Sequence, residues 1–213
     1  MTVHALPPPD AEHATDPLWT TICAEVHELI RTEPMLEEFL RATVLNHSSL
    51  ESALSAHLGN QIDCATIPAR VLCHVISEAF STRDDVRQAM RDDLQAVVER
   101  DSACESFHLP LLYFKGFHAL QLHRVANWLW LQGRRSLALL MQSRASMKFG
   151  VDIHPAAIFG SGIMLDHATG LVVGETAVVG NQVSILQSVT LGGTGKDHGD
   201  RHPKIADGVL ISA

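Results

Sequence analysis

The chain has 213 residues, of which 46% are hydrophobic and 19% charged, so it is long enough and apolar enough to bury a sizeable core. Acidic residues outnumber basic ones by 24 to 16, and the resulting net charge of −8 does not attract nucleic acid or an anionic membrane. The longest apolar run, at 128–131, is far shorter than the roughly 20 residues of a membrane span, and the N-terminus shows no secretory signal. We therefore expect a soluble, cytoplasmic protein.

The first two thirds of the chain carry a helical pattern. Residues 1–14 are rich in proline, alanine and acid, and we expect no fixed structure there. From 15 to 149 the apolar residues recur with a helical period, starting at an N-cap and first-turn proline, Asp16 and Pro17. The almost wholly apolar stretch from Leu111 to Leu131 predicts one central, buried helix. We therefore predict an all-α domain over 15–149.

A capping-box pattern marks the start of one of these helices. Ser48 and Glu51 have the spacing with which two side chains satisfy free backbone N–H groups in a first helical turn. The apolar stripe that follows reaches Gly59, a residue typical of helix ends. We predict a helix that begins after Ser48 and ends at Gly59.

Four cysteines are spread over the helical part, and none forms a CxxC pair. Without a secretory signal, such thiols are mostly free and buried. We therefore expect neither disulfides nor a cysteine-bound metal at Cys23, Cys64, Cys73 and Cys104.

After Phe149 the helical period gives way to a period of six. Hydrophobic residues occupy every sixth position, namely Ile153, Phe159, Leu165, Leu171, Ala177, Val183 and Val189. This period fits neither a helix nor a simple strand, but it is typical of a parallel β-solenoid with three flat sides of about six residues. We predict that 150–213 forms such a solenoid, and that each inward residue stacks on the one about eighteen positions later.

A polar segment interrupts the hexads. Residues 195–204 (GKDHGDRHPK) contain no inward-pointing hydrophobe, and the pattern resumes at Ile205. We expect a loop that leaves one corner of the solenoid. Loops on rigid scaffolds often carry function, although an insertion without function gives the same pattern.

Several segments resemble the serine acetyltransferase family. They are VDIHPAAIFGSGIMLDHATGLVVGETAVV, VSILQSVTLGGTGK and GDRHPKI, preceded by LPLLYFKGFHALQLHRVANWLW, and the likeness covers about 100–213. The resemblance implies an α+β chain in which a helical domain precedes a left-handed parallel β-helix. It also implies direct transfer of an acetyl group from acetyl-CoA, the co-substrate, to the hydroxyl of L-serine, the first step of L-cysteine biosynthesis, with no other cofactor and no metal.

The resemblance assigns the general base to His167, in LDHATG, and its orienting carboxylate to Asp152, in VDIHP. A neutral imidazole suits this role because the serine hydroxyl must lose its proton as it attacks the thioester. A carboxylate would fix the ring tautomer and stabilise the imidazolium. The two residues lie three positions short of one expected coil apart, so we expect them to be neighbours around a corner on successive coils. Without the resemblance, a surface histidine beside a turn aspartate would be the simpler interpretation.

The resemblance also assigns the groups that bind the amino acid. Asp101 and Asp166 are expected to bind its ammonium group, and Arg201 and His202, in the polar loop, its carboxylate. An arginine fork suits bidentate binding of a carboxylate. Ser102 follows Asp101 where the family usually has proline, which leaves open how Asp101 is presented.

Two further positions are expected to contact the acyl donor. Gly193 is the candidate backbone donor to the oxyanion, although its glycine also suits the turn into the loop. Ala213, the last residue, is placed with it at the oxyanion and coenzyme A site. From Ile153 onward there are fewer than three full coils, so we expect an incomplete, truncated β-helix with weakened coenzyme A binding.

The resemblance further implies partners and assemblies. L-cysteine is expected as a feedback inhibitor at the serine site, and the chain as a homo-oligomer, either a trimer or a dimer of trimers, with active sites between adjacent β-helices. The tail that docks onto O-acetylserine sulfhydrylase in the family has no counterpart in this sequence. Two alternatives stay open: a zinc hydratase like the γ-class carbonic anhydrases, suggested by the 13 histidines, and a catalytically silent oligomeric binding module.

Overall fold

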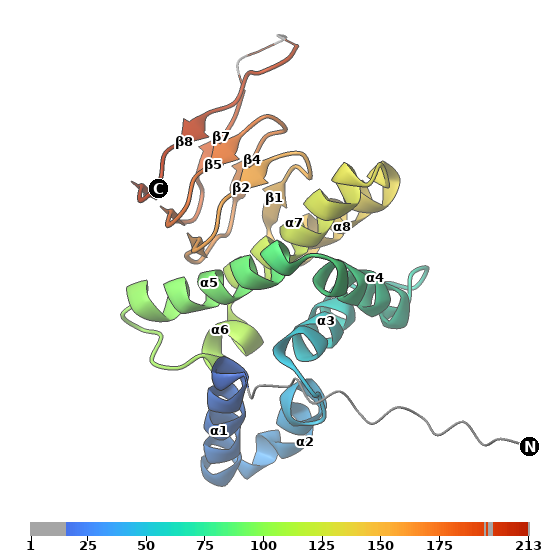
Figure 1. Cartoon of the computed structure of the whole chain (residues 1–213), viewed down its shortest axis with the longest axis vertical. Coiled ribbons are helices and arrows are strands. Elements are labelled where there is room, and N and C mark those ends of the chain that lie inside the picture. Colours follow the sequence, from blue (N-terminus) through green and yellow to red (C-terminus); the bar gives the residue numbers. More distant parts are fainter. Residues whose placement is uncertain (1–15, 194, 196–197, 213) are drawn as a thin grey trace, which may run out of the picture.

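The computed structural model describes residues 16–193, 195 and 198–212, so the predicted tail at 1–14 lies outside the described residues. Helices make up its first part and short strands its second (Figure 1). The helices are α1 (Pro17–Thr32), α2 (Glu37–Leu40), α3 (Leu50–Gln61), α4 (Ala69–Thr82), α5 (Asp84–Arg100), α6 (His108–Tyr113), α7 (Lys115–Leu131) and α8 (Arg135–Phe149), with a 3₁₀ turn at Pro34–Leu36 and a π turn at Arg41–Leu45. The strands are β1 (Val151–Ile153), β2 (Ile158–Phe159), β3 (Met164–Leu165), β4 (Leu171–Val173), β5 (Val178–Val179), β6 (Ser184–Ile185), β7 (Thr190–Leu191), β8 (Lys204–Ile205) and β9 (Leu210–Ile211).

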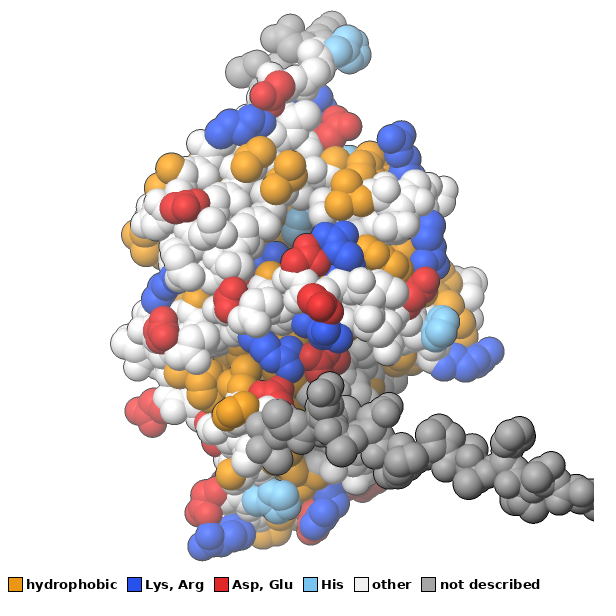
Figure 2. Space-filling model, in the orientation of Figure 1, with side chains coloured by type: hydrophobic (Ala, Val, Ile, Leu, Met, Phe, Trp, Pro, Cys, Tyr) orange, Lys and Arg blue, Asp and Glu red, His pale blue; other side chains and the backbone are white. Residues whose placement is uncertain are grey.

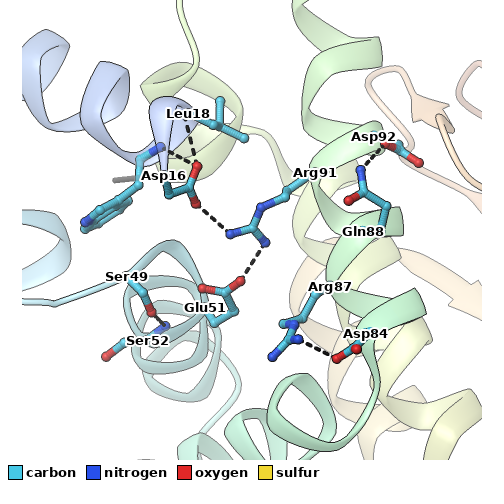
Figure 3. Close-up of polar contacts among 11 residues, drawn as sticks. Asp16, Leu18, Ser49, Glu51, Ser52, Asp84, Arg87, Gln88, Arg91 and Asp92 are labelled. Carbon is cyan, nitrogen blue, oxygen red and sulfur yellow. Dashed lines mark hydrogen bonds and ion pairs between the residues drawn. The ribbon is translucent and has the colours of Figure 1, made fainter. Parts of the chain in front are cut away.

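The first helix begins where the sequence predicts. Asp16 caps α1, and its Oδ1 accepts hydrogen bonds from the backbone N–H groups of Leu18 at 3.0 Å and Trp19 at 3.3 Å. Its Oδ2 lies 2.6 Å from Nη2 of Arg91, and Nη1 of the same guanidinium lies 2.5 Å from Oε1 of Glu51 (Figure 3). Arg91 therefore ties the starts of α1 and α3 to the middle of α5.

The boundaries of α3 differ from the prediction. Ser49, not Ser48, is the N-cap, and its hydroxyl accepts from the N–H of Ser52 at 3.3 Å. Gly59 does not end the helix, which runs on to Gln61. A Cβ at Gly59 would lie 2.4 Å from Sγ and 2.8 Å from the backbone N of Cys73, so this glycine allows α4 to approach α3 closely.

The predicted single helix over 111–131 is divided in two. Phe114 has an extended backbone and separates α6 from α7. Just after this break, a Cβ at Gly116 would lie 1.9 Å from the carbonyl oxygen of Leu165, so the start of α7 lies directly against β3. Thirteen of the seventeen residues of α7 are buried, as expected for a central helix. The break between α6 and α7 therefore lies where the chain meets the solenoid.

A buried ion pair joins the helices to the solenoid. The carboxylate of Asp93, on α5, is completely buried and receives two hydrogen bonds from Arg124 at 2.7 and 2.8 Å and one from Gln121 at 2.9 Å. It also accepts from the N–H of Ile163 at 2.9 Å, while Arg124 donates to the carbonyl of Gly160 at 2.8 Å. These contacts hold the corner between β2 and β3 against α5 and α7.

The strands form the predicted solenoid. They pair in parallel in three sheets, β1-β4-β7, β2-β5-β8 and β3-β6-β9, which make the sides of a prism (Figure 1). The register is eighteen residues between β4 and β7, where Val172 pairs with Thr190. Between β5 and β8 it is 204 − 178 = 26, because the loop between β7 and β8 projects from the prism (Figure 1).

The first coil is longer than predicted. Val151 pairs with Leu171, so its register is 171 − 151 = 20 residues rather than eighteen. Leu165 pairs with Ile185, and Val173 with Leu191. The path from Leu165 to Val173 takes eight residues, whereas that from Ile185 to Leu191 takes six, so the two additional residues lie in the corner 166–170. Ile153 consequently stacks on Val173 instead of Leu171.

Three further observations on the described residues concern membrane spans, the cysteines and the surface charge. None of their helices has the length and apolarity of a membrane span. All four cysteines are free. On the face in Figure 2, Lys and Arg side chains are interspersed with Asp and Glu, so neither sign of charge dominates it.

Candidate active site

A cavity of about 420 Å³ lies where the end of α5, the start of α7 and the corner after β3 meet. Three residues singled out in the sequence line it: Asp101, Asp166 and His167. Asp101 is far from the other two in sequence, and the packing of α5 and α7 on β3 brings it to them. Lys115 and Tyr113 also line the cavity. The cavity therefore combines two carboxylates, an imidazole and an ammonium group.

His167 stands out from the lengthened corner. Its φ is 53° and that of Ala168 is 60°, so two consecutive non-glycine residues adopt the left-handed conformation. The His167 side chain is 77% exposed, and its Nε2 lies 3.8 Å from Oδ1 of Asp166. The Nζ of Lys115 donates to Oγ1 of Thr169 in the same corner. The imidazole is thus available to a ligand, on a backbone held from α7.

Asp101 is held by its own turn. It follows the last residue of α5, and its N–H donates to the carbonyl of Val97 at 2.9 Å. Its Oδ1 accepts from the N–H of Ala103 at 2.9 Å. These two bonds present the carboxylate at the cavity with Ser102 in the position where the family usually has proline.

Asp152 projects outward from β1, since Val151 and Ile153 on either side of it are buried. Its Oδ1 accepts from Nε2 of Gln142 at 2.6 Å, and it makes no hydrogen bond with His167, both residues being in the described part. The expected spacing of three residues short of a coil is wrong, because this coil has twenty residues.

The backbone nevertheless keeps the two segments adjacent. The carbonyl of Gly150 accepts from the N–H of Gly170 at 2.8 Å, so the corner that carries His167 lies against the start of the strand that carries Asp152.

The other predicted residues gather at a different corner. Nη2 of Arg201 lies 3.0 Å from Oε2 of Glu175, and this hydrogen bond lowers the pKa of Glu175. Nδ1 of His202 accepts from the N–H of Thr176 at 3.2 Å and lies 2.8 Å from its hydroxyl. A Cβ at Gly193 would lie 2.9 Å from Cγ of Arg201 and 3.1 Å from Nε2 of His202. Gly193, Arg201 and His202 therefore form one cluster beside the corner after β4.

Strand β4 separates this loop cluster from the His167 cavity. With a rise of about 3.3 Å per residue, the four steps from Gly170 to Gly174 span about 13 Å. Neither Arg201 nor His202 lines the cavity. The loop cluster and the cavity thus occupy opposite edges of the β1-β4-β7 face in one chain.

Sequence reasoning missed Lys115, Gln142 and Glu175. Lys115 and Glu175 stand inside the segments quoted above, in the stretches FKGF and VGET. Their roles depend on partners from other elements, Thr169 and Arg201. Gln142 lies on a helix and contacts a strand, which no periodic pattern indicates.

Two further expectations concern metal binding and the site of the acyl donor. Within 16–193, 195 and 198–212, no group of three His, Cys, Asp or Glu side chains has the arrangement of a metal site. Ala213, expected at the oxyanion and coenzyme A site, lies outside the described residues.

Comparison with known proteins gives consistent matches. Residues 18–122 match the family described as "Serine acetyltransferase, N-terminal". The serine acetyltransferase of Escherichia coli K12 is 55% identical over 196 residues, which cover 92% of this chain and 72% of that protein. The enzyme of Haemophilus influenzae is 52% identical over 196 residues, covering 92% and 73%.

Solved structures agree. Soybean serine acetyltransferase complexed with serine has a TM-score of 0.90 at 55% identity, covering 92% of this chain and 81% of that one. Serine acetyltransferase from Brucella abortus in complex with coenzyme A has a TM-score of 0.92 at 50% identity, covering 96% and 82%. These likenesses confirm the fold class, a helical domain followed by a left-handed parallel β-helix. They do not support the alternative of a zinc hydratase.

Proposed function

This chain belongs to the serine acetyltransferase family, and from that premise we propose how its residues transfer an acetyl group from acetyl-CoA to the hydroxyl of L-serine. The observation that carries the proposal is the cavity of about 420 Å³ in which Asp101, Asp166 and His167 meet. It has room for an amino acid and the acyl end of a thioester.

His167 acts as the general base. Its neutral imidazole removes the hydroxyl proton of L-serine as the oxygen attacks the thioester carbonyl carbon. The C–S bond of the tetrahedral intermediate then breaks, and the departing thiolate takes the proton from the imidazolium. The products are O-acetyl-L-serine and coenzyme A. Asp152 orients the ring and stabilises its charged form once the exposed imidazole turns toward β1.

The two carboxylates in the cavity recognise the ammonium group of L-serine. Asp101 keeps one carboxylate oxygen free of its turn hydrogen bond, and Asp166 is adjacent to the base. Together they place the substrate hydroxyl at His167, with two negative charges facing one positive group.

Arg201 and His202 bind the substrate carboxylate from a neighbouring copy of the chain. In one copy they lie across β4 from His167, so a site with both clusters needs the loop of one chain beside the corner of the next. Val172, on the intervening strand, is 41% exposed and supplies apolar surface for such a contact. We infer a homo-oligomer built around the β-helix.

Gly193 donates its backbone N–H to the oxyanion of the intermediate. Its lack of a side chain lets Arg201 and His202 pack against the backbone there, so the donor and the carboxylate-binding groups are placed together. L-cysteine, which has the same ammonium and carboxylate groups, competes with L-serine for this site.

The test is thiol release from acetyl-CoA with L-serine, measured for His167→Ala and for a matched control, His74→Ala, at an exposed position of α4. We expect His167→Ala to lose about 1,000-fold in kcat and the control to keep wild-type activity. Retention of wild-type turnover by His167→Ala would remove the proposed base.

A further inference from the structure

The carboxylate assigned as the orienting group is itself held by the helical domain. Helix α8 ends at Phe149, and Gly150 adopts the left-handed conformation, with φ of 67°. This turn lets β1 pack beside the helix it has just left. Gln142, on α8, is thereby placed next to Asp152, and its Nε2 donates to Oδ1 at 2.6 Å.

The packing around Gln142 restricts its side chain. It lines a cavity of about 10 Å³ whose walls are otherwise largely apolar, from α7, α8 and β1. His123 also lines this cavity; it is 5% exposed, and its Nδ1 has no hydrogen-bond partner among the described residues. Such a volume suits a single water. Gln142 is only partly buried, and toward the interior it has little space to turn away from Asp152.

The chemistry of the contact fixes its direction. A carboxylate only accepts hydrogen bonds, so the amide must present its NH₂ group and not its oxygen. One carboxylate oxygen is then occupied by a neutral donor, and the other stays free for an imidazole N–H. His154, two residues beyond Asp152, interacts electrostatically with Asp152. It also interacts with the charged or titratable groups near the loop, namely Glu175, Arg201 and His202.

We propose that Gln142 is a positioning residue for catalysis, which holds Asp152 in the orientation that accepts the ring N–H of His167. This inference rests on the proposed function, in which Asp152 orients the base. Gln142 touches neither substrate nor base, and it acts only through Asp152.

The experiment is a double-mutant cycle of Gln142→Met and Asp152→Asn, with Gln132→Met, at an exposed position after α7, as the matched control. We expect Gln142→Met to lower kcat about 10-fold, to change the KM for L-serine by less than about twofold, and to shift the midpoint of the pH profile downward. In the Asp152→Asn background the same change should have no further effect.

A second variant guards against misfolding. Gln142→Glu keeps the size of the side chain but sets a carboxylate against a carboxylate, so we expect a larger loss than for Gln142→Met at pH 8. Wild-type kcat and pH profile in both variants, or an undiminished effect of Gln142→Met in the Asp152→Asn background, would overturn the inference.

The cycle also distinguishes a failure of the role proposed for Asp152 from a failure of the role inferred for Gln142. If Asp152→Asn itself keeps wild-type activity, the proposed orienting role of Asp152 fails. If Asp152→Asn loses activity and the Gln142 variants do not, only the positioning inference fails.

Discussion

Two corners at the same edge of the prism differ by two residues. The corner of the first coil passes from Asp166 to Gly170 through three residues, and the corner of the second passes from Leu186 to Ser188 through Gln187 alone. The shorter corner needs one left-handed residue, Ser188, with φ of 60°. The longer one has two such non-glycine residues in succession and carries an imidazole that is 77% exposed.

The comparison shows what the additional residues do. The second corner demonstrates that the solenoid closes without them, so the fold does not require the longer form. The longer corner costs conformational strain and places an outward-pointing imidazole beside a cavity. We propose that the lengthened corner serves the candidate site.

The role of the longer corner is tested by giving the first coil the shorter corner of the second coil. Replacing 167–169 by a single glutamine should leave the β-helix folded, because the next coil already has this geometry. Activity should fall by at least about 1,000-fold, because the proposed base, His167, is removed together with the corner that carries it. Circular dichroism and thiol release measure the two effects, and a shortened but active enzyme would contradict the conclusion.

At another corner of the first coil, a buried ion pair is expected to contribute more to stability than an ion pair on the surface. The corner between β2 and β3 is held by Asp93, whereas the pair Arg31–Glu28 lies on the surface of α1. Asp93→Ala should lower the free energy of unfolding by about 3 kcal/mol or more, because it leaves the Arg124 guanidinium buried without its partner. Glu28→Gln should cost less than about 0.5 kcal/mol in the same urea titration. Equal costs would show that the buried pair does not hold this corner.

Buried histidines contrast with exposed His167 and predict the pH dependence of stability. Burial lowers the pKa of both His118 and His123 to about 3, from an ordinary value of 6.5. Below pH 6.5 these two histidines bind protons in the unfolded chain but stay neutral in the folded chain. The free energy of unfolding therefore falls as the pH falls from 6.5 toward 3. The slope approaches about 1.4 kcal/mol per pH unit for each histidine.

Urea unfolding between pH 7 and 5 measures this effect. The hydrogen-bonded carboxylates Asp16 and Glu51 also have lowered pKa values, although burial opposes the shift, and they lose their contribution only as the pH approaches and passes below 3.8 and 4.5. The window from 6.5 to 5 therefore reports mainly on the histidines. Stability that stays constant or rises there would contradict the account.

The smallest expected effect concerns the bond that braces the longer corner. Lys115→Met removes the donor to Thr169 and should lower kcat about 5-fold, because the corner loses one hydrogen bond and not its shape. Lys115→Arg, which keeps a donor, should restore most of the activity. A loss in Lys115→Arg as large as in Lys115→Met would contradict a bracing role.

The sequence predicted the solenoid but not its register. Inward positions come in pairs along a strand, such as Val151 with Ile153 and Leu171 with Val173. A slip of two residues exchanges one apolar position for another and keeps the same face inward. The hexads therefore run without a break across the lengthened corner, and only strand pairing reveals it.

The predicted helix end at Gly59 and the predicted continuous helix across Phe114 were wrong for a different reason. Gly59 reads as a helix end, but its conformation is helical and its small size serves the contact with Cys73. The break at Phe114 depends on how α7 meets β3. Both features are set by tertiary packing, which local sequence does not encode.

The sequence predicted the shared position only of those site residues that stand in one motif. The motif containing Asp166 and His167 indicated their shared place, and α5 adds Asp101 in the cavity. The separation of Arg201 and His202 from that cavity follows from their place on the far edge of a sheet face. Hexad spacing does not show on which side of a strand a loop returns.

A crystal structure of the protein with bound L-serine would show where the substrate lies relative to His167. The proposed mechanism predicts the ammonium group between Asp101 and Asp166, the hydroxyl within hydrogen-bond distance of the His167 ring, and the carboxylate at Arg201 of a neighbouring copy. L-serine bound away from the corner 166–170, with its hydroxyl out of reach of His167, would contradict it.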